Sequence, residues 1–136
     1  MTNYLELVKE FHQAFGCHIS EELGFPEQDI INLRNDLISE ETYEFEQEIP
    51  YDEYNNGNIV KAAKELADIL YVVFGTALTF GIPIDDVFEE VHKSNMSKLD
   101  QSGKPVLRAD GKVLKSKYYQ EPNLYPILYP RNFNEI

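Results

Sequence analysis

One apolar stretch near the middle of the chain, residues 66–82, contains a single charged side chain, Asp68. Its uncharged part, residues 69–82, is too short to span a bilayer and is typical of a helix in a protein core. An unpaired carboxylate is costly to bury, so such a group loses its charge, pairs with a base or binds a cation. Glu65 lies one helical turn before Asp68, and the interior of this protein is therefore expected to hold more than one acid.

A second group of acids lies in the preceding predicted helix. The apolar side chains of that helix recur at steps of three and four and form one stripe, made by Ile30, Leu33 and Leu37. The stripe continues into Glu41, Glu44 and Glu48, so these acids are predicted to face the core, although a run of charges on a helix usually faces solvent. Glu41-x-x-Glu44 and Glu65-x-x-Asp68 are then two inward pairs, and their oxygens would suit a divalent cation such as Mg²⁺.

The pattern of apolar residues and end signals predicts four main helices, at about residues 3–15, 26–49, 58–80 and 83–99. Gly16 and Gly81 are typical helix stops. Asp110-Gly111 between apolar pairs predicts a β-hairpin within residues 104–115, and the tail from Tyr118 is expected to pack in extended form. The predicted fold is all-α, a four-to-five-helix bundle with a small C-terminal β-hairpin. We expect one domain over residues 1–136, with core helices in 3–99 and the hairpin and tail in 100–136.

Composition limits the classes of partner. The hydrophobic content of 43% predicts a folded core, and the net charge of −12 argues against a nucleic-acid or membrane-surface binder. The charge is uneven, because acids dominate residues 1–92 and bases dominate residues 93–117. An acidic body followed by a basic segment is the layout expected for a protein that binds a metal together with a polyphosphate. Alternatively, the basic segment only offsets the charge of the acidic body. The single Cys17 and the absence of a leader-like start favour a cytoplasmic location.

Three segments resemble a known superfamily. Residues 37–45 (LISEETYEF), residues 64–72 (KELADILYV) and residues 91–99 (VHKSNMSKL), the last followed by the hairpin, are similar to motifs of the all-α nucleoside triphosphate pyrophosphohydrolases. That superfamily includes the MazG-like enzymes, dimeric dUTPases and phosphoribosyl-ATP pyrophosphohydrolases. The resemblance covers about residues 30–120. The Asn95-x-x-Lys98 pattern at the end of the fourth predicted helix is closest to the MazG-like branch.

The resemblance implies a set of site residues. Metal ligands for Mg²⁺, with Mn²⁺ as an alternative, would be Glu41, Glu44, Glu65 and Asp68. The catalytic group would combine Glu41 with Glu40, which would position or deprotonate a water. Asn95 and Lys98 would contact the nucleotide. Lys112 and Lys115 of the hairpin would close over the phosphates. Alternatively, these two lysines only protect an exposed strand edge.

The leading functional hypothesis is a Mg²⁺-dependent pyrophosphohydrolase that cleaves the α–β phosphoanhydride of an NTP or dNTP to give a monophosphate and pyrophosphate. Two alternatives stay open, namely phosphoribosyl-ATP hydrolysis in histidine biosynthesis and a non-catalytic metal-binding helical module. The uncharged helix of residues 69–80 also predicts a homodimer or homotetramer, because one small bundle has little surface to cover it. No P-loop, EF-hand or zinc motif offers a competing site.

Overall fold

The computed structural model describes residues 1–130, which fall into two compact units. The first unit is Met1–Ile82 and the second begins at Pro83. The chain is mainly helical with one small antiparallel hairpin, and the predicted all-α class is confirmed. The expectation of one domain over residues 1–136 stays a prediction, and its last six residues lie outside the described part.

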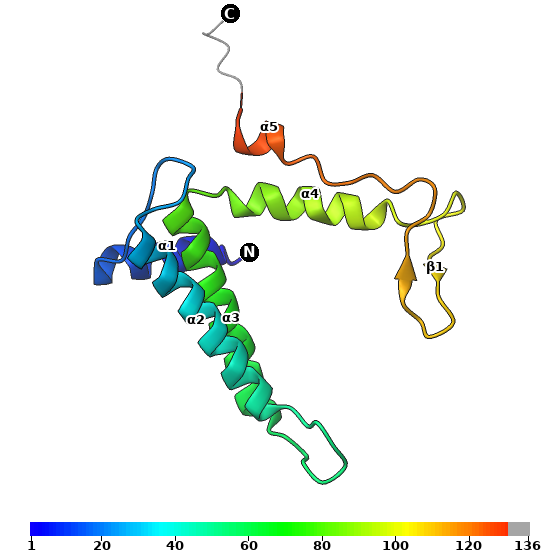
Figure 1. Cartoon of the computed structure of the whole chain (residues 1–136), viewed down its shortest axis with the longest axis horizontal. Coiled ribbons are helices and arrows are strands. Elements are labelled where there is room, and N and C mark those ends of the chain that lie inside the picture. The colour runs from blue at the N-terminus through cyan, green and yellow to red at the C-terminus, as the bar shows by residue number, and fades with distance from the viewer. Residues whose placement is uncertain (131–136) are drawn as a thin grey trace, which may run out of the picture. The chain divides into compact units, whose positions relative to one another are not determined.

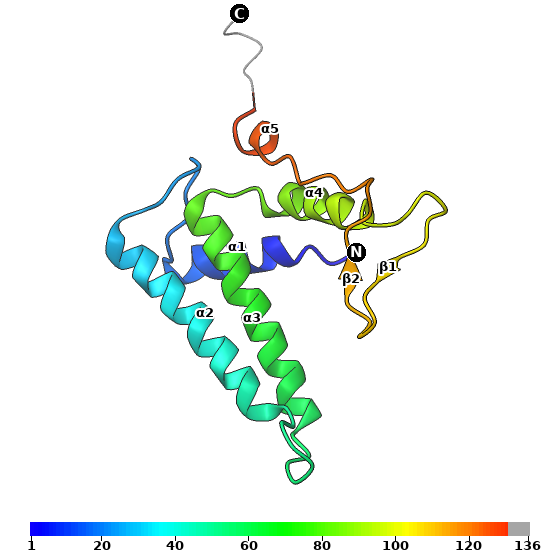
Figure 2. The same cartoon turned by 45° about the vertical axis from the view of Figure 1, so that its right-hand side comes forward.

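The first unit contains three helices, α1 (Tyr4–Phe15), α2 (Gln28–Glu48) and α3 (Ile59–Phe80). Helices α2 and α3 run antiparallel and side by side, and α1 packs against α3 (Figures 1 and 2). The loop of residues 49–58 joins α2 to α3 and is fastened at its base, where the backbone N–H of Asn58 donates to the carbonyl of Glu48 at 2.8 Å. The antiparallel packing of α2 on α3 brings the two helices that contain the acidic pairs into contact.

Local signals explain where these helices begin and end. The Asn3 side chain accepts a hydrogen bond from the backbone N–H of Glu6, and Asn58 does the same for Lys61, so each asparagine satisfies a free donor of a first turn. Gly16 and Gly81 adopt left-handed backbone angles, with φ of 71° and 66°, and end α1 and α3. The predicted boundaries of the first three helices are confirmed within two residues.

The buried interior of the first unit mixes small apolar residues with polar ones. Val8, Ala62 and Ala77 are buried, and so are four polar side chains: His12, Arg34, Glu65 and Thr79. The predicted inward position of Leu33 is wrong, because this side chain is 54% exposed. The stripe that faces α3 instead contains Arg34, which follows Ile30 by four residues and precedes Leu37 by three. A basic side chain therefore lies where an apolar one was predicted.

The second unit contains α4 (Ile84–Met96), a hairpin of β1 (Val106–Leu107) and β2 (Val113–Leu114), and the short helix α5 (Tyr125–Leu128). Val106 pairs with Leu114 and Leu107 with Val113, as expected from the Asp-Gly turn. Helix α4 ends three residues before the predicted Leu99, and the tail contains one short helix where only extended chain was expected.

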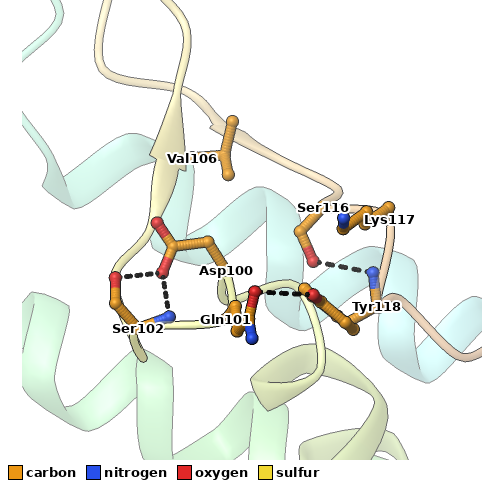
Figure 3. A pocket seen from close by; sticks show the side chains of 7 residues that line it. All are labelled: Asp100, Gln101, Ser102, Val106, Ser116, Lys117 and Tyr118. Atoms are coloured by element: carbon orange, nitrogen blue, oxygen red, sulfur yellow. Dashed lines mark hydrogen bonds between the residues drawn. The ribbon is translucent and has the colours of Figure 1, made fainter.

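Hydrogen bonds tie the chain before the hairpin to the chain after it. The Tyr118 hydroxyl, after the hairpin, donates to the side-chain oxygen of Gln101, before it, at 3.2 Å (Figure 3). Within the chain before the hairpin, the Asp100 carboxylate accepts bonds from the hydroxyl and backbone N–H of Ser102. The Ser94 hydroxyl of α4 donates to the carbonyl of Gln120 at 2.7 Å, so the tail packs on α4. Within residues 1–130, no single helix is long and apolar enough to cross a membrane, although α3 and α4 taken together pass that test of length and composition as a bent pair.

Candidate metal centre

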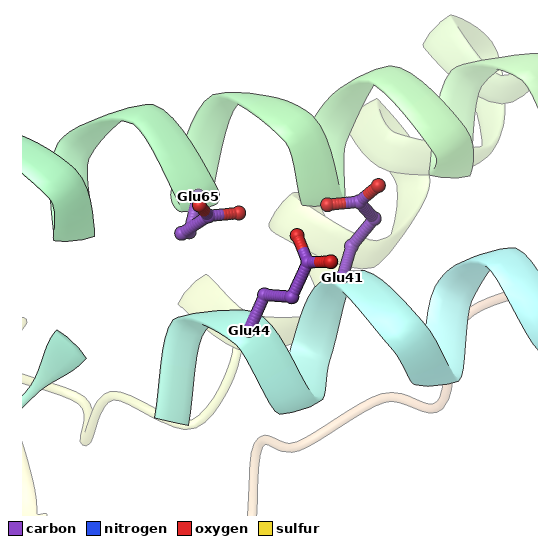
Figure 4. A group of neighbouring side chains, drawn as sticks. All are labelled: Glu41, Glu44 and Glu65. Carbon is purple, nitrogen blue, oxygen red and sulfur yellow. The ribbon is translucent and has the colours of Figure 1, made fainter. Parts of the chain in front are cut away.

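Three glutamates meet between α2 and α3. One carboxylate oxygen from each of Glu41, Glu44 and Glu65 lies within 4.8 Å of the others, and Figure 4 shows the three side chains converging from the two helices. Glu41 and Glu44 are one turn apart on α2, which places both on the side that faces α3. Glu65 comes from α3 and is buried. The antiparallel helix pair thus gathers acids that are far apart in the sequence.

Two oxygens of this group have no hydrogen-bond partner within residues 1–130. They are Oε2 of Glu41 and Oε2 of Glu65, and both are enclosed even though the Glu41 residue as a whole is only half-buried. Buried carboxylate oxygens without partners are rare in proteins because the loss of hydration is not offset. A hard cation would satisfy both oxygens, and an all-carboxylate donor set suits Mg²⁺ or Mn²⁺. The residues present therefore fit a divalent metal.

The electrostatics of the group match this interpretation. Burial raises the pKa of Glu41 above its ordinary value, and the negative charges of Glu44, Asp68 and Glu65 raise it further. Lys64 opposes this effect, since its ammonium lies near the same acids. Without a cation, this repulsion favours the protonated form of Glu41.

Asp68 takes a less central position than expected. Its carboxylate pairs with Lys64, one turn earlier on α3, at 2.7 Å, and its side chain is 34% exposed. The structure does not include Asp68 in the three-residue group, but its charge acts on Glu41, so it lies at the edge of the cluster. Lys64 also contacts Glu65 at 3.4 Å, and it thereby supplies the positive charge nearest to these acids.

The remaining predicted site residues are exposed or lie in the second unit. Glu40 is exposed on α2 beside Glu41. Asn95 is exposed in the last turn of α4, and its carbonyl accepts the backbone N–H of Lys98 at 3.2 Å. Lys112 belongs to the hairpin turn, and the ammonium of Lys115 lies 4.5 Å from the centre of the Tyr119 ring. Their roles in substrate binding and catalysis stay predictions.

Sequence reasoning missed Arg34. This side chain is buried between α2 and α3, and its Nε donates to the Thr76 hydroxyl at 3.1 Å while Nη2 donates to the Val72 carbonyl at 2.9 Å. The signal was present in the sequence, because Arg34 is the only base in α2 and it precedes Glu41 by seven residues, which is about two helical turns on the same face.

Comparison with known proteins gives the family. The model of the phosphoribosyl-ATP pyrophosphohydrolase family matches residues 8–95, a range that contains all four predicted metal ligands. The chain belongs to this family. The family is part of the all-α NTP pyrophosphohydrolase superfamily, which includes the MazG-like proteins, so the resemblance of the motifs is confirmed.

One relative is a viral protein. An uncharacterized protein of Acanthamoeba polyphaga mimivirus is 31% identical over 121 residues, which cover 86% of this chain. The aligned region is 43% of the viral protein, so the chain spans less than half the length of this relative.

Proposed function

We propose that this chain is a Mg²⁺-dependent pyrophosphohydrolase that converts an NTP or dNTP into its monophosphate and pyrophosphate. The observation that carries the proposal is the convergence of Glu41, Glu44 and Glu65 with two enclosed, unpartnered oxygens. Acids arranged in this way would bind a cation that contacts a polyphosphate. The family match supports pyrophosphohydrolase chemistry. Mn²⁺ fits the same donors.

The residues divide the chemical work. Glu41, Glu44 and Glu65 would hold the metal, and Asp68, at the edge of the cluster, would complete the set. A bound Mg²⁺ would supply charge neutralisation for the phosphates and would lower the pKa of a water beside it. Glu40, which lies outside the enclosed group, accepts a proton from the attacking water. The water oxygen bonds to the α-phosphorus as the bond from that phosphorus to the bridging oxygen breaks, and pyrophosphate leaves.

Phosphoribosyl-ATP is the second candidate substrate. The family model that matches residues 8–95 is named for hydrolysis of that compound, which is the observation in its favour. The same carboxylate group would serve either substrate, because both contain an α–β phosphoanhydride. The two candidates differ at the base end of the substrate, because phosphoribosyl-ATP carries an additional ribose phosphate on its adenine.

The test is pyrophosphate release from phosphoribosyl-ATP and from a panel of NTPs and dNTPs, with and without Mg²⁺. We expect Mg²⁺-dependent release in the wild type and a loss of more than about a hundredfold in Glu44→Gln, because one inward ligand is removed. Glu46→Gln is the matched control, since Glu46 is exposed on the same helix. Equal activity of Glu44→Gln and Glu46→Gln at saturating Mg²⁺ would refute the metal assignment. No release from any nucleotide would favour a non-catalytic module.

A further inference from the structure

Lys64 is the one base that forms an ion pair with the carboxylate group within residues 1–130. Its ammonium lies 2.7 Å from Oδ2 of Asp68 and 3.4 Å from Oε1 of Glu65. A lysine that precedes its acid by four residues is the weaker orientation of a helical ion pair, so this contact adds little to the stability of α3. The pair with Asp68 is better explained by the chemistry of the carboxylate group.

The ammonium reaches only the outer edge of that group. It contacts one oxygen of Glu65, while Oε2 of the same side chain and Oε2 of Glu41 are enclosed and have no hydrogen-bond partner in the described chain. Exposure increases outward, because the side chains of Glu65, Asp68 and Lys64 are 11%, 34% and 65% exposed. One lysine therefore offsets charge on the solvent side and leaves the inner oxygens to a ligand that enters between α2 and α3.

The ion pair also accounts for the position of Asp68. Asp68 follows Glu65 by one turn of α3, which places both acids on one side of the helix. The Asp68 carboxylate nevertheless pairs with Lys64 and is not among the three whose oxygens lie within 4.8 Å of one another. A cation that enters the group must draw Asp68 away from Lys64, and the positive charge of the ammonium opposes its entry. Lys64 thus competes with the cation for Asp68.

A bound polyphosphate would give the released ammonium a new partner. The enclosed oxygens lie between the helices, so a polyphosphate approaches the group from its exposed edge, where Lys64 lies. An ammonium on a flexible stem, with three donors, suits phosphate oxygens. We propose that Lys64 couples the binding of metal and substrate, because it holds Asp68 in the metal-free protein and exchanges Asp68 for a phosphate oxygen when both ligands bind. The inference rests on the proposed function for the metal and the polyphosphate.

The first test measures metal binding without a nucleotide. Calorimetric titration of Mg²⁺ into the metal-free protein should show about three- to fivefold tighter binding in Lys64→Met than in the wild type, because Asp68 is released to the cation. Lys61→Met is the matched control, since Lys61 is exposed one turn earlier on α3 and forms no ion pair within residues 1–130. An equal gain in the two variants would reveal a general effect of charge and overturn the proposal.

The second test measures phosphate binding at saturating Mg²⁺. The probe is inorganic tripolyphosphate, which offers the phosphates without a base. Lys64→Met should bind it about tenfold more weakly than the wild type, because a charged hydrogen bond is lost, whereas Lys61→Met should stay within about twofold. Lys64→Arg keeps the charge and should return both affinities to near the wild-type values. If Lys64→Met leaves both affinities unchanged or shifts them in the same direction, the proposal is wrong.

A third comparison separates failure of this inference from failure of the proposed function. If Glu44→Gln binds Mg²⁺ as tightly as the wild type, the metal site is misplaced and both proposals fall. If Glu44→Gln loses Mg²⁺ binding while Lys64→Met matches Lys61→Met, the metal site stands and only the role of Lys64 is refuted. In an Asp68→Asn background, Lys64→Met should no longer strengthen Mg²⁺ binding beyond the effect of Lys61→Met, and a gain that persists there would contradict the release of Asp68.

Discussion

At the scale of single residues, the structure disfavours the charged form of Glu41. Its Oε2 is enclosed, and its pKa is raised first by burial and then by the charges of Glu44, Asp68 and Glu65. The metal-free protein therefore stores repulsion at this position, which a bound cation or a proton would relieve. The same acid that suits a metal site lowers the stability of the protein without the metal.

This repulsion predicts a pH-dependent effect of Glu41→Gln. The pKa of Glu41 is raised on folding. The contribution of this carboxyl group to the free energy of unfolding is therefore fully present below the ordinary pKa of the free side chain, and it is lost as pH rises through the folded pKa. In the presence of a chelator, the variant should have a higher Tm than the wild type at pH 7, and the difference should disappear in acid.

The measurement is thermal unfolding between pH 4 and pH 8 at constant ionic strength, with Glu46→Gln as the exposed control. A variant that is less stable than the wild type at pH 7 without metal would contradict the explanation. Added Mg²⁺ should reverse the order, because only the wild type gains a complete ligand set.

Asp68 and Arg34 show where sequence reasoning succeeds and fails for single residues. The acidic pairs were predicted from helical spacing, and the structure brings Glu41, Glu44 and Glu65 together. The central position given to Asp68 was not found, because it was inferred from the apolar character of its neighbours, and Leu66 and Leu70 are half-exposed. Apolar composition does not reveal which face of a helix is covered within one chain.

At the scale of elements, one residue of α3 without a side chain leaves room for side chains of α1 and α2. Gly75 allows Arg34 of α2 and His12 of α1 to approach the backbone of α3 at the same place. Helix propensity alone would favour alanine over glycine at an interior position by about 1 kcal/mol. The glycine is therefore explained by packing and not by the helix itself.

Gly75→Ala should destabilise the protein by about 1–3 kcal/mol, the usual range for an overfilled core, despite the gain in helix propensity. The free energy of unfolding in urea measures this, and an increase in stability would contradict the close packing of Arg34 and His12. Arg34→Ala combined with Gly75→Ala should lose less than the sum of the single changes, because the clash with the guanidinium is absent in the double variant.

The elements themselves were the most predictable part of the fold. Asn3, Asn58, Gly16 and Gly81 are local signals, and each lies at the end of a helix as expected. The meeting of α2 with Gly75 of α3 could not be predicted in the same way, because it depends on how two distant segments pack. Local chemistry determines where a helix ends, whereas the partner of each face is a property of the assembled unit.

At the scale of the whole molecule, large apolar side chains remain uncovered on the first unit. Tyr4 and Leu7 of α1 and Leu66 and Leu70 of α3 are at least half exposed. A groove of about 160 Å³ between α1 and α3 is lined by Leu7, Leu70 and other apolar residues. A surface of this kind is typical of an interface between proteins. We propose that a second copy of the chain covers it.

Light scattering at micromolar concentration should therefore give at least twice the chain mass of 15.8 kDa. Leu70→Glu should shift the mass toward one chain, because a charge would be buried in the interface. Tyr43→Glu is the control, since Tyr43 is exposed on α2 and lies outside the groove. A wild-type protein with the mass of one chain would refute the proposal.

The fastened loop between α2 and α3 has a consequence for protein engineering. Its ends are held by the bond from Asn58 to Glu48, while Tyr51 and Tyr54 in its middle are exposed. Loop closure costs little extra free energy as a loop lengthens, so added residues between these tyrosines should leave the register of the two helices unchanged. A peptide tag or a fluorophore could be inserted there, where it would extend from the same helix pair that presents the carboxylates and report on them without altering the pairing.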